Sequence, residues 1–133
     1  MRLDAITAAL LAAAALCAGG FAVNAMAATE RPPVPVAKHG VLTGAHGMTL
    51  YTFAKDKAHS RQSACNGVCA KNWPPFIASA SRAAEGNYSF VRRAGGQMQW
   101  AYKGKPLYYW HLDRKPGDRK GDGFKNVWHV ARP

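Results

Sequence analysis

The sequence predicts a mostly β fold: a small single domain of two β-hairpin-based repeats, with an aromatic core and at most one or two short helical turns. A motif of the form Leu-Tyr-x-aromatic-x-x-Asp occurs twice, at residues 50–56 and 107–113. No segment keeps a helical periodicity, whereas short apolar runs alternate with glycine-containing turns. All Trp and Tyr residues lie beyond residue 28, where Leu and Ile are few, so aromatic rings must fill the core.

The two copies of the motif have matching surroundings. Gly47 and Gly104 each stand three residues before the Leu, and the copies begin 57 residues apart, at 50 and 107. That spacing is long enough for each copy to belong to its own supersecondary unit. We therefore expect a domain over residues 38–133, with repeat one at about 38–78 and repeat two at about 88–131.

Residues 1–27 predict a cleaved signal peptide. Arg2 gives a basic start, an apolar run follows, and Ala25-Met26-Ala27 fits the small-x-small rule for cleavage. An uncleaved membrane anchor is the alternative, but the run is Ala-rich and is interrupted by Gly19-Gly20. We expect the mature chain in the periplasm or outside the cell, with no transmembrane span.

Two features near the predicted cleavage site concern a possible membrane anchor and the segment that precedes the domain. A lipid anchor at Cys17 is the less favoured alternative, because a lipidation signal needs a small residue where Leu16 stands. Residues 28–37 contain three prolines and predict an extended tether before the domain.

In repeat one, apolar runs around a glycine turn predict a hairpin. The strand candidates are residues 41–43 and 48–53, separated by Gly44-Ala45-His46-Gly47. Side-chain alternation places Tyr51 and Phe53 on one face of the strand, and Leu50 and Thr52 on the other. The segments expected after the strand are a polar loop at 55–63, one helical turn within 64–72 that ends before Pro74-Pro75, and a polar link at 79–87.

Repeat two opens with a stronger hairpin signal, because residues 88–93 and 97–102 flank Gly95-Gly96. Pro106 suits the first residue of a strand or a sheet edge. The remaining expected elements are a strand at 107–111, a charged loop at 114–123 and a last strand at 127–130.

Two cysteines, Cys65 and Cys69, remain in the predicted mature chain. An even number of cysteines in an oxidising compartment predicts a disulfide, and Asn66-Gly67 supplies a tight turn between them. A loop this short would stabilise the fold by only about 2 kcal/mol in the chain-entropy model. If reduced, the pair could instead join a metal site or exchange thiols.

Several ordered motifs resemble those of the bacterial secreted-repeat proteins, predicted lipoproteins with a Yx(FWY)xxD motif. The similarity covers roughly residues 38–131 and implies a two-repeat fold, but it implies no particular activity. The motif residues are Tyr51, Phe53 and Asp56 in the first copy and Tyr108, Trp110 and Asp113 in the second.

The repeated carboxylates Asp56 and Asp113 have two interpretations. They could be ligands or acid–base groups related by pseudo-symmetry, or they could accept backbone N–H groups at the mouths of their loops. Repeated architecture alone explains their recurrence, and a catalytic carboxylate also needs a shifted pKa and a cleft. We therefore favour the structural interpretation.

Metal-binding patterns are weak. Residues 118–123 partly resemble a calcium loop, but Lys120 puts a positive charge at a ligand position. Copper or zinc could use His and Met side chains, although none has a tight ligand spacing. The weak candidates are His46, Met48, His111 and His129.

The formal net charge is +11. A basic protein outside the cytoplasm is not expected to meet nucleic acid, and its partners would be phospholipid, lipopolysaccharide, an acidic glycan or an acidic protein. Alternatively, the charge only maintains solubility. The candidate anion-binding residues are Arg92, Arg93, Lys103, Lys105, Arg114, Lys115, Arg119 and Lys120.

No nucleophile elbow, P-loop or zinc-protease helix favours an enzyme. The leading hypothesis is an exported, non-enzymatic envelope protein that acts as a binding or structural module without a cofactor. The rival hypothesis is a periplasmic carrier of copper, zinc, haem or redox equivalents. A third is a hydrolase with a cleft lined by Asp113 and a neighbouring His.

Overall fold

The structure is a computed structural model that describes Gly20, residues 33–79 and residues 83–133. Apart from Gly20, the expected signal peptide lies outside the described residues, as does the start of the expected tether. The elements are β1 (Val36–Lys38), β2 (Val41–Thr43), the 3-10 turn η1 (Ala45–Gly47), β3 (Tyr51–Phe53), α1 (Val68–Asn72), β4 (Tyr88–Arg92), β5 (Met98–Tyr102), β6 (Lys105–Pro106), the 3-10 turn η2 (Phe124–Asn126) and β7 (Trp128–Val130).

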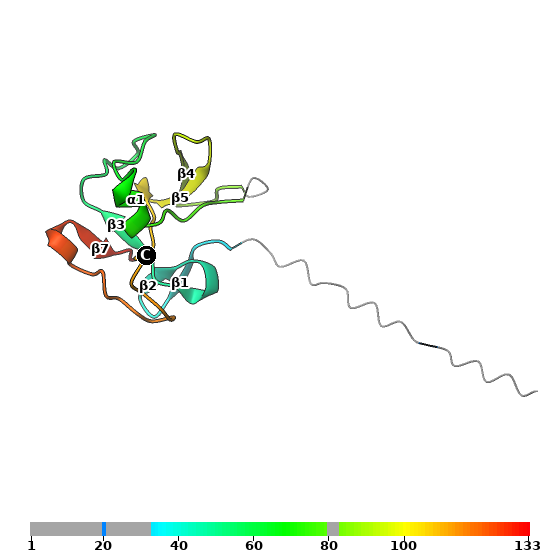
Figure 1. Cartoon of the computed structure of the whole chain (residues 1–133). Coiled ribbons are helices and arrows are strands. Elements are labelled where there is room, and N and C mark those ends of the chain that lie inside the picture. Colours follow the sequence, from blue (N-terminus) through cyan, green and yellow to red (C-terminus); the bar gives the residue numbers. More distant parts are fainter. Residues whose placement is uncertain (1–19, 21–32, 80–82) are drawn as a thin grey trace, which may run out of the picture.

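The predicted mostly β class is therefore confirmed, with one short α-helix and two 3-10 turns in the described residues. In Figure 1 the β1–β2 pair and the β4–β5 pair lie at opposite ends of the domain, with β3 and β7 on one side between them. No helix in this part of the chain has the length and apolar content that a membrane span requires.

Repeat one departs from the expected hairpin in its second arm. β2 pairs with β1, so Val36 and Ala37, the end of the expected tether, belong to a strand. We expected β2 to pair with a strand at residues 48–53. The structure has one isolated bridge there, between Thr43 and Thr49, and β3 begins only at Tyr51.

In repeat two, β4 and β5 form the predicted antiparallel hairpin, and β6 adds a third strand. The strand expected at residues 107–111 is not formed, since Tyr108 makes only isolated bridges to Tyr51 and Pro75. Pro74 and Pro75 have no N–H to continue a ladder along this segment. Pro106 ends β6 and does not start a strand, but β6 is an edge strand of its sheet, which was the other expected position.

The turns that precede the two motifs share an unusual backbone. Gly47 and Gly104, which stand at equivalent positions in the two repeats, have φ of 73° and 77°. The residues before them, His46 and Lys103, also have positive φ, at 55° and 48°. Two consecutive positive φ values favour glycine in the second position, because a side chain is strained there.

The two repeats interlock instead of folding separately. β3 of repeat one pairs with β7 of repeat two. At the centre, the N–H of Tyr51 donates to the Tyr108 carbonyl at 2.8 Å, and the N–H of Tyr108 donates back to Tyr51 at 3.0 Å. The N–H of Phe76 donates to the Leu107 carbonyl at 3.0 Å. At the equivalent position of repeat two, the N–H of Ala131 donates to the Leu50 carbonyl at 2.8 Å. These reciprocal bonds are those of two halves related by an approximate two-fold axis.

Aromatic rings dominate the core, as predicted, and they form two clusters. Tyr51 and Phe53 point into one cluster and Leu50 into the other, which matches the expected alternation along β3. The first cluster contains Val41, Tyr51, Phe53, Cys65, Trp73, Tyr108, Trp110, Trp128 and Val130. The second contains Leu42, Leu50, Phe76, Ala78, Trp100, Leu107 and Ala131.

Candidate functional site

The repeated tyrosines and aspartates bond across the repeats. The hydroxyl of Tyr51 donates to Asp113 Oδ2 at 2.6 Å, and the hydroxyl of Tyr108 donates to Asp56 Oδ2 at 2.7 Å. The tyrosine of each motif therefore satisfies the aspartate of the other. Asp56 and Asp113 are only 2% and 8% exposed, so these charge-assisted bonds lie within the core.

The second oxygen of each carboxylate accepts a backbone N–H from the loop that follows it. Asp56 Oδ1 accepts the N–H of Ala64 at 2.6 Å, and Asp113 Oδ1 accepts the N–H of Lys120 at 3.0 Å. All four carboxylate oxygens are thus engaged inside the fold. This geometry favours the interpretation of Asp56 and Asp113 as loop acceptors. The sequence did not indicate that each aspartate would also accept a hydrogen bond from the tyrosine of the other repeat.

The environment of these tyrosines raises their pKa values. Burial raises the pKa of Tyr51 far above its ordinary value, and the hydrogen bond to Asp113 raises it further. Burial likewise raises the pKa of Tyr108; its bond to Ser63 lowers that pKa, and its bond to Asp56 raises it. Burial also raises the pKa of Tyr109 to about 12, although the N–H of Ala45 lowers it.

We expect the stability of the protein to fall as the pH rises above about 10. Tyrosines in the unfolded chain ionise near their ordinary pKa of 10.0, while Tyr51, Tyr108 and Tyr109 stay protonated in the folded state. Stability from this source is complete below pH 10 and is lost above it, because the unfolded state releases its protons first.

Two measurements test this expectation: urea unfolding at about pH 9 and about pH 11, and the phenolate absorbance of the native protein. At about pH 11 the native absorbance should correspond to well under the five tyrosines of the chain. A native protein with all five ionised at that pH would contradict the structure.

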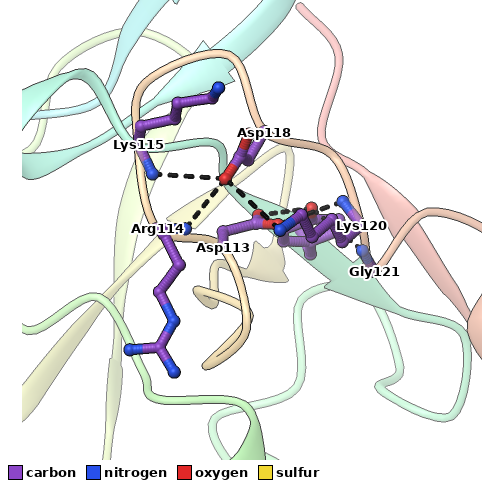
Figure 2. A network of polar contacts seen from close by, with 7 residues as sticks. Asp113, Arg114, Lys115, Asp118, Lys120 and Gly121 are labelled. Carbon is purple, nitrogen blue, oxygen red and sulfur yellow. Dashed lines mark hydrogen bonds and ion pairs between the residues drawn. The ribbon is translucent and has the colours of Figure 1, made fainter.

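The charged loop between Asp113 and Gly123 uses its carboxylates on its own backbone. Figure 2 shows that Asp118 Oδ2 accepts the N–H groups of Arg114 (2.9 Å) and Lys115 (3.2 Å). These backbone bonds, that of Arg114 foremost, lower the pKa of Asp118. Asp122 Oδ1 accepts the N–H of Val130 at 3.0 Å. The residues that resembled a calcium loop thus bind different backbone segments.

As a result, few cations have an acidic partner. Among the described residues, one ion pair is formed, between Lys120 and Asp118 at 4.0 Å. Asp56 and Asp113 are enclosed by tyrosine and backbone donors, and the loop aspartates by backbone N–H groups. The positive charge of the domain is therefore left largely uncompensated at its surface.

One cavity in the described part of the chain has a basic lining. It measures about 520 Å³ and lies between the loop before the disulfide and the β4–β5 hairpin. We call it the arginine pocket. Its lining residues are Arg61, Gln62, Ser63, Asn66, Arg92, Arg93 and Ala94.

Arg93 connects the two walls of the arginine pocket. Its Nη1 donates to Gln99 Oε1 at 2.8 Å, and its Nη2 donates to the Cys65 carbonyl at 2.8 Å and to Asn66 Oδ1 at 3.3 Å. Gln99 is fully buried and also donates to the Leu107 carbonyl at 2.8 Å. Arg93 is therefore held in place by neutral acceptors.

A second cavity of about 260 Å³ lies beside β1 and β2. Lys38 and Arg119 supply its cations, and Arg119 donates to the His39 carbonyl at 3.2 Å. The buried Thr49 also lines it, and the Thr49 hydroxyl has no hydrogen-bond partner. Neither cavity is lined by a carboxylate among the described residues.

The eight predicted anion-binding residues have different local surroundings. Arg92 and Arg93 line the arginine pocket, and Arg119 lines the second cavity. Lys105 Nζ donates to the Asp56 carbonyl at 2.6 Å, and Lys103 Nζ lies 5.2 Å from the centre of the Tyr102 ring. The others, Arg114, Lys115 and Lys120, belong to the loop in Figure 2.

Sequence reasoning missed Arg61 and Gln99. Arg61 is one of many exposed cations, and only the fold brings its loop to the β4–β5 hairpin. Alternation along Met98, Gln99 and Trp100 predicts an exposed Gln99, so no local pattern indicated that this amide is buried. A buried amide of this kind needs partners, and Arg93 is one of them.

The weak metal candidates come from different elements, except that Met48 directly follows the turn η1 that contains His46. His46 is in η1, His129 is exposed on β7, and His111 Nδ1 lies 3.0 Å from the Asn72 carbonyl. Within the described ranges no group of three or more His, Cys, Asp or Glu side chains is placed to hold a metal ion.

The predicted disulfide is confirmed. Cys65 and Cys69 are bonded, with their Cα atoms 5.2 Å apart, and Cys65 is fully buried. Gly67, in the turn between them, has a φ of 58° and precedes α1. The bond therefore fixes the short segment that joins the arginine pocket to α1.

A protein-family model described as a secreted repeat of unknown function matches the chain twice, at residues 36–77 and 89–132. Comparison with curated proteins and with solved structures gives no match. Each matched stretch is one of the two interlocked halves described above.

Proposed function

The chain belongs to the family of secreted repeats of unknown function, and from this premise we propose that it is a non-enzymatic binding module that holds an anionic component of the cell envelope. It acts in the periplasm or at the cell exterior. Its partner is a phosphate-bearing envelope surface, formed by phospholipid or lipopolysaccharide.

The observation that carries the proposal is that few of the described cations have an acidic partner. The described aspartates are occupied by tyrosine hydroxyls and backbone N–H groups, and one Lys–Asp ion pair is formed in residues 33–79 and 83–133. Both cavities are lined by cations without a carboxylate. If the charge served solubility alone, these concave surfaces would not need to exclude carboxylates.

Electrostatics gives the expected behaviour of this binding. Each Lys or Arg held near an anionic membrane contributes about 1 kcal/mol, and the interaction decays over about 8 Å at physiological ionic strength. With a formal net charge of +11, the chain should bind anionic surfaces well at low salt and poorly at high salt.

The test is co-sedimentation of the purified mature chain with lipid vesicles. We expect binding to vesicles that contain phosphatidylglycerol, little binding to phosphatidylcholine alone, and a steep loss as salt is added. The variant R114Q/K115Q/K120Q should bind more weakly, whereas K115R/K120R, which keeps the charge, should bind like the wild type. Equal binding to neutral vesicles, or binding that salt does not weaken, would contradict the proposal.

The rival hypothesis of a metal or redox carrier has a direct test of its own. Elemental analysis of protein purified from its native compartment would detect stoichiometric copper, zinc or haem iron. Such a result would replace the proposed function.

A further inference from the structure

We propose that the arginine pocket is the specific site of this protein for a phosphate group, and that the rest of the cationic surface only attracts its carrier. The inference rests on the proposed function, because it names the group of the anionic component that is recognised. The shared chemistry is a tetrahedral phosphate, whether it belongs to a lipid headgroup or is free.

The side chains of the pocket match that chemistry. Arg61, Arg92 and Arg93 place three guanidinium groups around one cavity, and Gln62 and Ser63 add an amide and a hydroxyl. A guanidinium presents its N–H groups as a planar fork that binds two phosphate oxygens at once. Carboxylates, which would compete with a phosphate for these forks, are absent from the lining.

Arg93 is positioned before any ligand arrives. Among the described residues its partners are neutral: the amide oxygens of Gln99 and Asn66 and the Cys65 carbonyl. The three bonds use both hydrogens of Nη2 and one of Nη1, which leaves the Nε–H and one Nη1–H as single donors for a ligand, while Arg61 and Arg92 supply the forks. Because Gln99 is fully buried, the guanidinium is held in place and binding costs less side-chain entropy.

The opposite wall is fixed by the motif of repeat one. The Ser63 hydroxyl lies 2.5 Å from the Tyr108 hydroxyl, which donates to Asp56, and the neighbouring Ala64 N–H donates to the same carboxylate. Arg61 is exposed and lies two residues before Ser63. The buried Tyr108–Asp56 pair therefore anchors the wall, while the exposed Arg61 and Arg92 remain free to close on a ligand.

The second cavity is a weaker candidate for the same role. It is half the size of the arginine pocket, and Arg119, its one arginine, already donates to the His39 carbonyl. It has one guanidinium group, whereas the arginine pocket has three.

The experiment compares two double variants that remove the same charge. R61Q/R92Q alters exposed side chains of the pocket, and R114Q/K115Q alters exposed side chains of the loop in Figure 2. Inorganic phosphate is titrated against chloride at constant ionic strength, and binding is followed by NMR shifts of the arginine side chains and nearby amides. In the second arm the same proteins bind vesicles that contain phosphatidic acid.

We expect saturable shifts around the arginine pocket in the wild type and in R114Q/K115Q, and affinity for phosphate lower by about tenfold or more in R61Q/R92Q. On vesicles R61Q/R92Q should lose more binding than its charge-matched control. If the two variants lose vesicle binding equally and phosphate gives no saturable shift, the pocket inference is overturned while the proposed function stands. If the wild type does not bind vesicles, the proposed function fails, and a saturable phosphate response then identifies the pocket as a site for free phosphate.

Discussion

Replacing Tyr108 by phenylalanine is expected to lower the free energy of unfolding by about 1.5–3 kcal/mol, the usual contribution of a hydrogen bond to a charged group. The substitution keeps the ring but removes the hydroxyl that donates to Asp56 at 2.7 Å. Asp56 is 2% exposed, so water cannot replace the lost donor easily. Urea unfolding near neutral pH measures the change.

The pseudo-symmetry of the fold adds a second part to this prediction. Tyr51 donates to Asp113 at 2.6 Å in the equivalent arrangement, so Tyr51→Phe should cost a similar amount. Tyr102→Phe is the matched control, because Tyr102 is half-buried and its hydroxyl makes no hydrogen bond in the described structure. A Tyr108→Phe protein as stable as the Tyr102→Phe protein would show that the exchanged bonds do not hold the repeats together.

Features with a local signal could be predicted from the sequence. Gly95-Gly96 between two apolar runs indicated the β4–β5 hairpin, and the equal spacing of Gly47 and Gly104 identified a turn that recurs with nearly the same φ. Alternation along residues 50–53 placed Tyr51 and Phe53 in one cluster and Leu50 in the other. Each of these follows from the backbone preference or side-chain period of a few neighbouring residues.

Long-range partners could not be predicted in this way. β3 pairs with β7, which lies more than seventy residues further along the chain, and Tyr51 bonds to the aspartate of the other repeat. The alternation within a strand identifies its buried face but not the strand beside it. The same limit explains the wrong strand at residues 107–111, whose neighbours come from repeat one and include a proline.

The candidate site shows the same division. Arg92 and Arg93 were found as cations, but composition does not show that the aspartates would be occupied by backbone N–H groups. Nor does it bring Arg61 to the β4–β5 hairpin. The charge could be counted from the sequence, whereas its lack of compensation is a property of the fold.

Replacing Trp73 by alanine is expected to have the largest effect on stability, a loss of about 3–5 kcal/mol. Trp73 is 3% exposed and stacks on Trp128, its counterpart in repeat two, with ring centres 3.8 Å apart and planes 3° from parallel. Its ring also lies 4.1 Å from that of Trp110 and 5.4 Å from that of Tyr51. A domain with a total stability of about 5–15 kcal/mol would lose a large part of it.

The shape of the unfolding transition makes this prediction specific to an interlocked fold. Since Trp73 and Trp128 share one cluster, Trp73→Ala and Trp128→Ala should each shift a single cooperative transition to lower urea. Phe124→Ala is the control, because its ring also contacts Trp73 but is 37% exposed, so the expected loss is smaller. Two separate transitions, with only one moved by Trp73→Ala, would mean that the repeats fold as independent units and that the exchanged strands and bonds are not what stabilises the domain.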